Sequence, residues 1–203
     1  MRDIVILGST GSIGVQALEV IAANPTKFRV VGLSAGSNNL DRLAEQVKKF
    51  SVPIVGTTGD AQSLKSALPG VQVIDGPQSS HQIAALSCDV VLNGITGSIG
   101  LGPTLAALDV GNTVALANKE SLVAGGDLVM AHGRDRIIPV DSEHSALFQA
   151  MSAGKLSDVE KVILTASGGP FRDRDDLSSV TLADALNHPT WSMGPVVTIN
   201  SAT

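Results

Sequence analysis

The sequence predicts a doubly wound α/β fold with a mainly parallel sheet, and three observations support this. The 203 residues are 43% hydrophobic but only 2% aromatic, with abundant Val, Ile, Leu, Ala and Gly. This composition is typical of β-branched strands packed on alanine-rich helices. Strand-like and helix-like segments alternate along most of the chain, and a glycine-rich turn follows the first strand.

The elements follow from the spacing of apolar residues. Residues 3–7 form a short apolar run typical of a buried strand, whereas residues 15–23 place apolar side chains on one helical face. Further strands are expected over residues 28–33, 53–55, 71–74, 89–92, 113–117 and 137–140. Further helices are expected over residues 40–50, 61–67 and 101–108, and one more begins near Glu143. Strands that alternate with helices predict parallel pairing through helical crossovers.

The chain changes character after Met151, and a second domain is expected over residues 151–203. A strand over residues 159–165 precedes a charged stretch, and a short helix is expected over residues 182–187. The last segment, residues 196–200, reads as another strand. Residues 1–150 therefore form one domain, and the remainder begins an α+β domain.

Charge and cysteine content narrow the class of protein. With 14 Lys and Arg against 19 Asp and Glu, the net charge is -5, which predicts no binding to nucleic acid or to an anionic membrane. A small anionic substrate stays possible because it needs only local positive groups. The single Cys88 cannot form an internal disulfide, and no signal segment precedes the first strand, so we expect a cytoplasmic protein without a membrane span.

The turn after the first strand carries Gly8, Gly11 and Gly14 in the spacing Gly-x-x-Gly-x-x-Gly. Gly8 permits a tight turn, Gly11 lets backbone N–H groups approach a pyrophosphate, and Gly14 lets the helix pack closely. The N-terminus of that helix adds partial positive charge. An ordinary strand-to-helix turn that favours glycine is the alternative. Between a strand and a helix, the motif predicts a Rossmann-like dinucleotide site.

The end of the second predicted strand bears on the choice of cofactor. Residues 34–39 read Ser-Ala-Gly-Ser-Asn-Asn and contain no acid. A carboxylate at this point would bind the ribose hydroxyls of NAD and repel a 2′-phosphate. Ser and Asn side chains can donate to a phosphate instead, so NADP is favoured. A plain turn accounts for the same residues.

Two carboxylates follow the strand over residues 137–140. In extended backbone Asp141 and Glu143 point to the same side, so they can converge on one hard cation, Mg²⁺ or Mn²⁺. The alternative is helix capping, with Asp141 or Ser142 as the N-cap and Glu143 in the first turn. His144 is expected to pack beside the carboxylates rather than to bind the metal.

Lys119 and Glu120 follow the strand over residues 113–117 at the same edge of the sheet. Lys119 can neutralise a substrate oxygen and Glu120 can orient the nicotinamide, or the segment is a helix start capped by Asn118. The other histidines, His81 and His132, fall on presumed helix surfaces and receive no role.

Two loops of the second domain are further candidates. Ser167 and the two glycines after it can offer a hydroxyl and backbone donors to a phosphate, or they form a domain-linking turn. Trp191, between His188 and Met193 in a loop rich in Pro and Gly, suits a lid that excludes water. A hydrophobic plug at the domain junction is the competing interpretation.

Five motifs in order resemble the 1-deoxy-D-xylulose 5-phosphate reductoisomerases, NADPH- and metal-dependent enzymes of the non-mevalonate isoprenoid pathway. The motifs are GSTGSIG from Gly8, ANKES from Ala117, VDSEH from Val140, SGGPF from Ser167 and HPTWSMG from His188. The resemblance runs along the whole chain. It implies that a Rossmann-like NADPH-binding domain over residues 1–150 precedes the start of the catalytic domain over residues 151–203.

The resemblance also implies roles for individual positions. The chain differs from the family at one of them, because the family often has a basic residue where this chain has Ser37. The implied NADPH-binding residues are Thr10, Gly11, Ser12, Ile13, Gly36, Asn38, Asn118, Glu120 and Gly194. The implied substrate-binding residues are Lys119, Ser142, Glu143, Ser167, His188, Trp191 and Ser201. Asp141 and Glu143 are the implied metal ligands, and together with Lys119 and His188 they are the implied catalytic residues.

The implied reaction is isomerisation and NADPH-dependent reduction of 1-deoxy-D-xylulose 5-phosphate, with Mg²⁺ or Mn²⁺, to 2-C-methyl-D-erythritol 4-phosphate. A homodimer is implied for the full-length protein. In the family an Asn-Lys pair and a third metal ligand, a Glu, follow the motif around Ser201, and the 203-residue sequence does not contain them. We therefore expect this chain to fold its nucleotide domain but not to turn over substrate by itself. A non-catalytic NADP-binding module and another NADP-dependent reductase are the alternatives.

Overall fold

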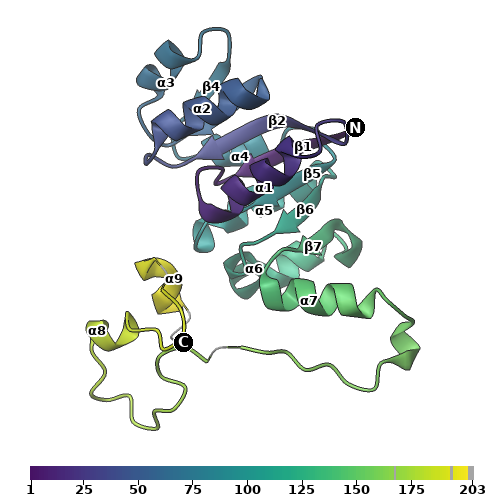
Figure 1. Ribbon diagram of the computed structural model, residues 1–203, viewed down its shortest axis with the longest axis vertical. Helices are drawn as coiled ribbons and strands as arrows, with labels where there is room; N and C mark the ends of the chain where they lie inside the picture. The colour runs from purple at the N-terminus through teal and green to yellow at the C-terminus, as the bar shows by residue number, and fades with distance from the viewer. Residues whose placement is uncertain (167, 193, 201–203) are drawn as a thin grey trace. The chain divides into compact units, whose positions relative to one another are not determined.

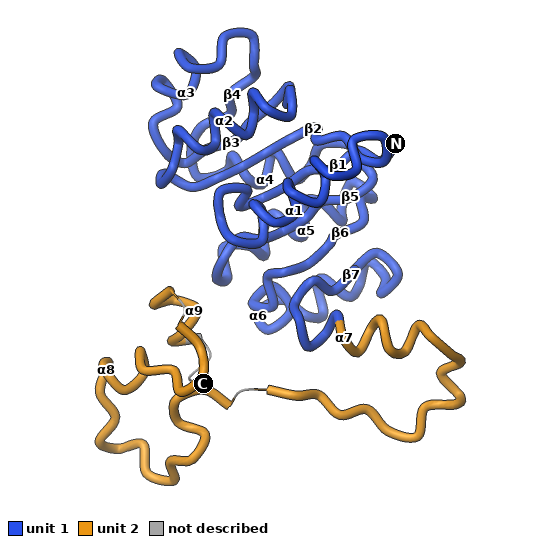
Figure 2. The backbone as a smooth tube through the Cα atoms, viewed as in Figure 1, with its two compact units in different colours: residues 1–145 blue, residues 146–203 orange. Residues whose placement is uncertain are grey.

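The computed structural model describes residues 1–166, 168–192 and 194–200. The chain divides into two compact units, Met1–Ser145 and Ala146–Thr203, coloured separately in Figure 2. The division falls between Ser145 and Ala146, inside a helix.

The first unit is built on a parallel sheet with the strand order β4-β3-β2-β1-β5-β6-β7, which counts seven strands in the described part of the chain (Figure 1). The predicted doubly wound α/β fold is therefore confirmed. The strand order reverses between β1 and β5, the position at which sheets of this kind bind ligands. The strands are β1 (Arg2–Leu7), β2 (Phe28–Ala35), β3 (Ile54–Thr57), β4 (Gln72–Asp75), β5 (Val90–Asn93), β6 (Thr113–Leu116) and β7 (Ile137–Pro139).

Helices cover both faces of this sheet. They are α1 (Ser12–Ala22), α2 (Leu40–Phe50), α3 (Ala61–Ala67), α4 (Ser79–Ala84), α5 (Leu101–Asp109), α6 (Glu120–Met130) and α7 (Ser142–Met151), with 3₁₀ turns at Ser98–Gly100 and Arg134–Arg136. Alternate residues of β1 enter opposite cores, Ile4 and Ile6 with α1 and α2, Val5 and Leu7 with α4 and α5. Because both faces of the sheet are covered here, residues 4–7 of β1 form an unbroken apolar run, as the sequence predicts.

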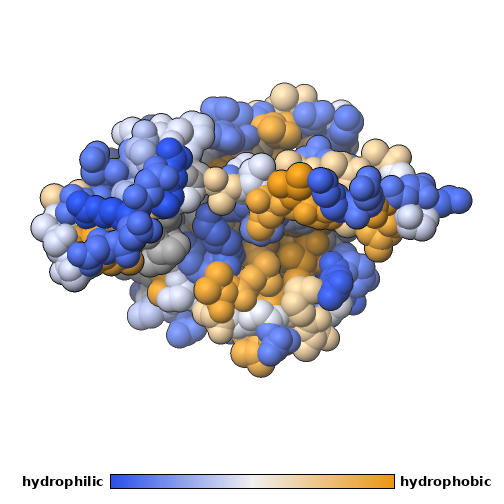
Figure 3. All heavy atoms as spheres, turned by 90° about the horizontal axis from the view of Figure 1, so that it is seen from below, coloured by the Kyte–Doolittle hydropathy of each residue, from blue (hydrophilic) through white to orange (hydrophobic). Residues whose placement is uncertain are grey.

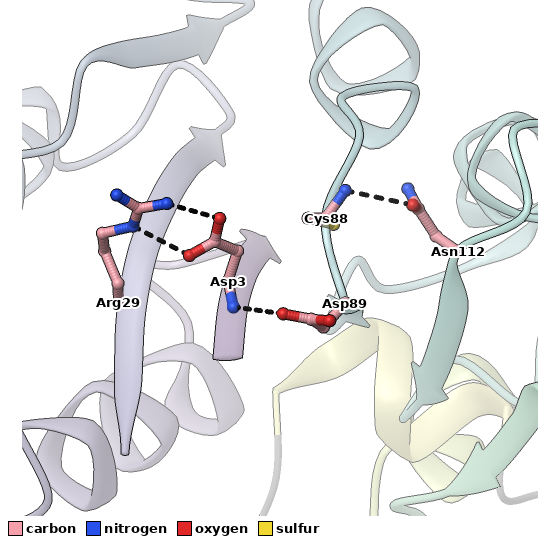
Figure 4. A network of polar contacts seen from close by, with 5 residues as sticks. All are labelled: Asp3, Arg29, Cys88, Asp89 and Asn112. Carbon is pink, nitrogen blue, oxygen red and sulfur yellow. Dashed lines mark hydrogen bonds and ion pairs between the residues drawn. The ribbon is translucent and has the colours of Figure 1, made fainter. Parts of the chain in front are cut away.

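Polar contacts join the strands at the amino end of the sheet (Figure 4). The Arg29 guanidinium donates to both carboxylate oxygens of Asp3 at 2.8 and 2.6 Å, and this hydrogen-bonded pair lowers the pKa of Asp3. The N–H of Asp3 donates to Asp89 at 2.7 Å, and that of Cys88 donates to Asn112 at 3.2 Å. Burial raises the pKa of the Cys88 thiol to about 11.

The second unit holds the end of α7, a 3₁₀ turn at Leu156–Asp158, α8 (Leu182–Ala185) and α9 (Pro195–Asn200). The strand expected over residues 159–165 is wrong, because the segment finds no pairing partner in the described residues and its apolar side chains are exposed. The strand expected over residues 196–200 is also wrong: Pro195, favoured in the first turn of a helix, starts α9 there. No helix in the described ranges is both long and apolar enough to cross a membrane.

Candidate functional site

A cavity of about 710 Å³ lies against the glycine turn in the first unit. Its walls come from the turn itself, from the segment after β2, from α4 and from the segment after β5. This is the crevice beyond the carboxyl ends of the strands at the reversal of strand order. Its lining residues are Gly8, Gly11, Ala35, Gly36, Asn38, Thr58, Pro77, Gln78, Ser80, His81, Gly94, Ile95, Thr96, Ile99, Gly102 and Pro103.

The glycine turn has the backbone geometry that its sequence predicts. Gly8 adopts a φ of 75°, which favours glycine, and a Cβ on Gly14 would lie 2.5 Å from the Cα of Ser9. Since α1 begins at Ser12, the N–H groups of Ser12 and Ile13 have no acceptor within the helix. The turn therefore presents backbone donors at the start of a helix, as an anion site requires.

Helix α2 holds the glycine turn through two side chains that the sequence analysis did not single out. The buried Ser9 Oγ donates to Gln46 Oε1 at 2.8 Å, and Gln46 Nε2 donates to the Ser9 carbonyl at 2.9 Å. Arg42 Nη1 donates to the Thr10 carbonyl at 3.4 Å. The two residues lie four apart and so share one helix face. The sequence does contain a signal for this contact, because Gln46 is a polar residue among the buried apolar residues of α2, Leu43 and Val47.

The segment after β2 forms the next wall of the cavity. Gly36 and Asn38, two of the residues that the family resemblance implies for NADPH binding, both line it, and Thr57 Oγ1 donates to the Gly36 carbonyl at 3.3 Å. The lining residues include no carboxylate, Lys or Arg. His81, to which the sequence analysis gave no role, belongs to the lining.

Asn118 holds the opposite wall of the cavity, which is formed by the segment after β5, through hydrogen bonds to its backbone. Its Nδ2 donates to the carbonyls of Ile95 and Gly97 at 2.5 and 2.7 Å, while its Oδ1 accepts from the N–H of Ser121 at 2.8 Å and from the Ser121 hydroxyl. The bond to the Ser121 N–H lies at the start of α6, but the N-cap of that helix is Lys119, so Asn118 precedes the cap position. Asn118 is buried and fully engaged with protein, so it positions the cavity wall.

A chain of buried hydrogen bonds continues from Asn118 into the sheet. Asn93 Nδ2 donates to Thr104 Oγ1 at 2.8 Å and to the Gly100 carbonyl at 2.9 Å, and the hydroxyls of Thr104 and Ser121 lie 3.2 Å apart. Because every member is buried and paired, the network fixes this wall.

The carboxylate cluster lies beyond β6 and β7. Lys119 Nζ is 3.4 Å from Asp141 Oδ2, and His144 Nδ1 is 2.9 Å from Asp141 Oδ1, as expected for a histidine packed beside the carboxylates. Partial burial acts to raise the pKa of the Asp141 carboxyl, but the hydrogen bond with His144 and the charge of Lys119 outweigh it and lower that pKa. Asp141 is therefore a carboxylate at neutral pH.

The second carboxylate, Glu143, accepts a hydrogen bond from Ser142 Oγ at 2.9 Å. Since α7 begins at Ser142, Asp141 occupies the N-cap position and Glu143 lies in the first turn, as the capping alternative requires. Among the described residues no three His, Cys, Asp or Glu side chains group to hold a metal. The donor chemistry of the two carboxylates suits a hard cation, and these residues supply part of a ligand set.

A cavity of about 540 Å³ adjoins Lys119, Asp141 and His144. Most of its lining is apolar, including Leu122 and Ile137. Hydrophobic side chains also stay exposed on α6 and β7, among them Val123, Leu128 and Ile138, and Figure 3 shows hydrophobic residues in orange on the face of the molecule seen from below.

The remaining predicted site residues are distributed over both units. Glu120 is the half-buried first residue of α6. In the second unit, His188 Nδ1 accepts from the N–H groups of Thr190 and Trp191 at 3.1 and 2.9 Å, and the Trp191 side chain is exposed. The carbonyl of Gly194 accepts from Thr198 at the start of α9. Ser167, Met193 and Ser201 lie outside the described residues.

Comparison with known families decides the affiliation of the chain. A family model described as 1-deoxy-D-xylulose 5-phosphate reductoisomerase matches residues 4–126, and a model of the C-terminal domain of the same enzyme matches residues 137–203. The chain belongs to the 1-deoxy-D-xylulose 5-phosphate reductoisomerase family. The resemblance noted in the five motifs is thereby confirmed.

Relatives of the same name align with the whole chain. The reductoisomerase of Streptomyces coelicolor is 54% identical over 215 residues, with 100% of this chain and 51% of the relative covered. That of Leifsonia xyli is 55% identical over 207 residues, with 100% and 52% covered. The chain spans about half the length of the curated relatives it matches.

Solved reductoisomerases share the fold. A reductoisomerase in complex with NADPH, fosmidomycin and magnesium superimposes with a TM-score of 0.77 at 32% identity, and the match covers 100% of this chain and 54% of the chain of that structure. The Zymomonas mobilis reductoisomerase in complex with NADPH superimposes with a TM-score of 0.80 at 38% identity, and the match covers 93% of this chain and 52% of that chain.

Proposed function

We propose that this chain provides the NADPH site and two metal-binding carboxylates of a 1-deoxy-D-xylulose 5-phosphate reductoisomerase. The whole enzyme isomerises and reduces 1-deoxy-D-xylulose 5-phosphate to 2-C-methyl-D-erythritol 4-phosphate. The observation that carries this proposal is the cavity of about 710 Å³ at the glycine turn, in a chain of this family.

The chemistry of the residues that line the cavity suits NADPH. The bare backbone of Gly11 and the N–H donors at the start of α1 suit the pyrophosphate, and Thr10, Ser12 and Ile13 complete this part of the site. Gly36 and Asn38 form the adenosine side, where the lining holds no acid that would repel a 2′-phosphate. When bound, NADPH supplies the hydride. Asn118, Glu120 and Gly194 complete the proposed cofactor residues.

Asp141 and Glu143 are the proposed ligands for Mg²⁺ or Mn²⁺. A bound divalent ion polarises a substrate carbonyl and stabilises negative charge on its oxygen. Asp141 is held ionised by His144 and Lys119, and is therefore ready to coordinate without losing a proton. The ammonium of Lys119, more than half exposed, can turn from Asp141 to a substrate oxygen.

The residues proposed to contact the sugar phosphate are those that the family resemblance implies. Those residues are Lys119, Ser142, Glu143, Ser167, His188, Trp191 and Ser201. Trp191, exposed in its own unit, suits a lid that closes over bound substrate. Cytoplasmic location and a homodimeric full-length enzyme belong to the same proposal.

Titration of the 203-residue chain with NADPH, followed by nucleotide fluorescence, tests the cofactor site. We expect saturable binding that is tighter than binding of NADH. Calorimetric titration with Mn²⁺ tests the carboxylates, because Asp141→Asn should weaken metal binding while NADPH binding stays intact. Failure to bind NADPH would refute the cofactor assignment, and unchanged Mn²⁺ affinity in Asp141→Asn would refute the metal assignment.

A further inference from the structure

We infer that Arg42 binds the 2′-phosphate of NADPH and so determines the preference of this site for NADPH over NADH. The inference rests on the proposed function and adds a specificity residue to it. The lining of the cavity contains no Lys or Arg, and a cation binds a dianionic phosphate more strongly than neutral donors do, because its hydrogen bonds are charge-assisted.

Arg42 lies where two walls of the cavity approach each other. It stands in the first turn of α2, four residues after the lining residue Asn38. Its Nη1 is 3.4 Å from the carbonyl of Thr10, which adjoins the lining residue Gly11. The guanidinium thus reaches from the segment after β2 to the glycine turn. In dinucleotide-binding folds the adenosine ribose lies at the end of β2, and a nearby Arg accommodates the 2′-phosphate.

The orientation of Arg42 is set by packing. Gln46, four residues further along α2, is buried and exchanges two hydrogen bonds with Ser9. Because residues four apart share a helix face, these bonds direct the face that carries Arg42 toward the glycine turn. The exposed guanidinium is therefore held at the rim of the cavity.

Arg42 retains donors and charge for a ligand. A guanidinium has five N–H donors, and the contact with Thr10 uses one of them. Across the described ranges of the chain, no carboxylate forms an ion pair with Arg42. Ser37, at the tip of the same segment, offers only a hydroxyl. Arg42 is thus the side chain that brings a full positive charge to this rim.

The test compares ligands that differ only in the 2′-phosphate. Dissociation constants are measured for NADPH, NADH, 2′,5′-ADP and 5′-AMP with wild type, Arg42→Ala and Arg42→Lys. The control is Lys48→Ala, which removes an exposed positive charge later on the same helix. We expect Arg42→Ala to weaken binding of NADPH and 2′,5′-ADP about 10- to 100-fold, as loss of a charge-assisted hydrogen bond implies, and to change binding of NADH and 5′-AMP less than about twofold. Arg42→Lys should recover part of the loss, and Lys48→Ala should behave as wild type.

The other outcomes separate this inference from the proposed function. An equal loss for NADPH and NADH would overturn the inference, because it would place Arg42 at the pyrophosphate or in a purely structural role. Unchanged affinities in Arg42→Ala would overturn it as well, while the NADPH site itself would stand. Absence of all binding by wild type would refute both.

Discussion

Gly14→Ala is the substitution by which the close packing of α1 on the glycine turn can be measured. The added Cβ would lie 2.5 Å from Ser9 Cα and 2.6 Å from the Gly8 carbonyl oxygen. Reaching an ordinary contact near 3.4 Å requires a displacement of about 0.9 Å. The turn cannot retreat, because Gly8 is itself packed against the backbone of Gly94 and Ser9 is held by Gln46.

Helix α1 must therefore tilt away from the turn. Overpacking of this kind costs about 1–3 kcal/mol, and the better helix propensity of alanine returns up to about 1 kcal/mol. We expect a net loss of about 1–2 kcal/mol in the free energy of unfolding. Displacement of the N–H donors at the start of α1 should also weaken NADPH binding about tenfold or more.

Urea unfolding followed by far-ultraviolet circular dichroism measures the stability, and NADPH fluorescence measures the binding. Gly126→Ala in α6 is the matched control, since a Cβ there has no atom within 4 Å and should leave stability unchanged or raised. Wild-type stability together with wild-type NADPH affinity in Gly14→Ala would refute the packing argument.

Three further predictions concern stability and reactivity. Gln46→Leu leaves the buried Ser9 hydroxyl without its acceptor and should lower the free energy of unfolding by about 1–3 kcal/mol in urea titrations, whereas an unchanged midpoint would contradict the role of this pair. The hydrogen bond with Arg29 lowers the pKa of Asp3 below 3.8, so the pair stabilises the fold fully above that pH and loses its effect as the pH falls through the folded-state pKa. The difference in urea midpoint between wild type and Arg29→Ala should therefore shrink below pH 3.8. With its pKa raised from 9.0 to about 11, the Cys88 thiol should react with iodoacetamide at pH 8 about 100-fold more slowly than a free cysteine and accelerate with rising pH, and fast labelling would contradict this.

The sheet was predictable because each strand carries its own signal. The apolar run of β1 is buried on both faces, and the glycine spacing after it predicts the turn that the structure contains. In the second unit the same kind of signal failed. Residues 159–165 have strand-like composition, but a strand also needs a neighbour with which to pair, and composition does not specify that neighbour.

The candidate site was predictable where a motif positions backbone or carboxylates. Gly11, Gly36 and Asn38 line the cavity, and Asp141 lies beside Lys119 and His144. The supporting side chains could not be found in this way. Arg42 and Gln46 reach the glycine turn across more than 30 residues of sequence, and that contact follows from the docking of α2, a tertiary event.

The two walls of the cofactor cavity differ in how freely they can change. The segment after β2 lines the cavity through Gly36 and Asn38, and its hydrogen bond to a side chain is with Thr57 and not with the carboxylates. The opposite wall is held by Asn118, whose neighbour Lys119 pairs with Asp141. A substitution that shifted the backbone at Asn118 would therefore also shift the residue that pairs with Asp141. We therefore expect substitutions that change cofactor preference to be tolerated better in the segment after β2 than at the wall held by Asn118, which serves both the cavity and the neighbouring carboxylates.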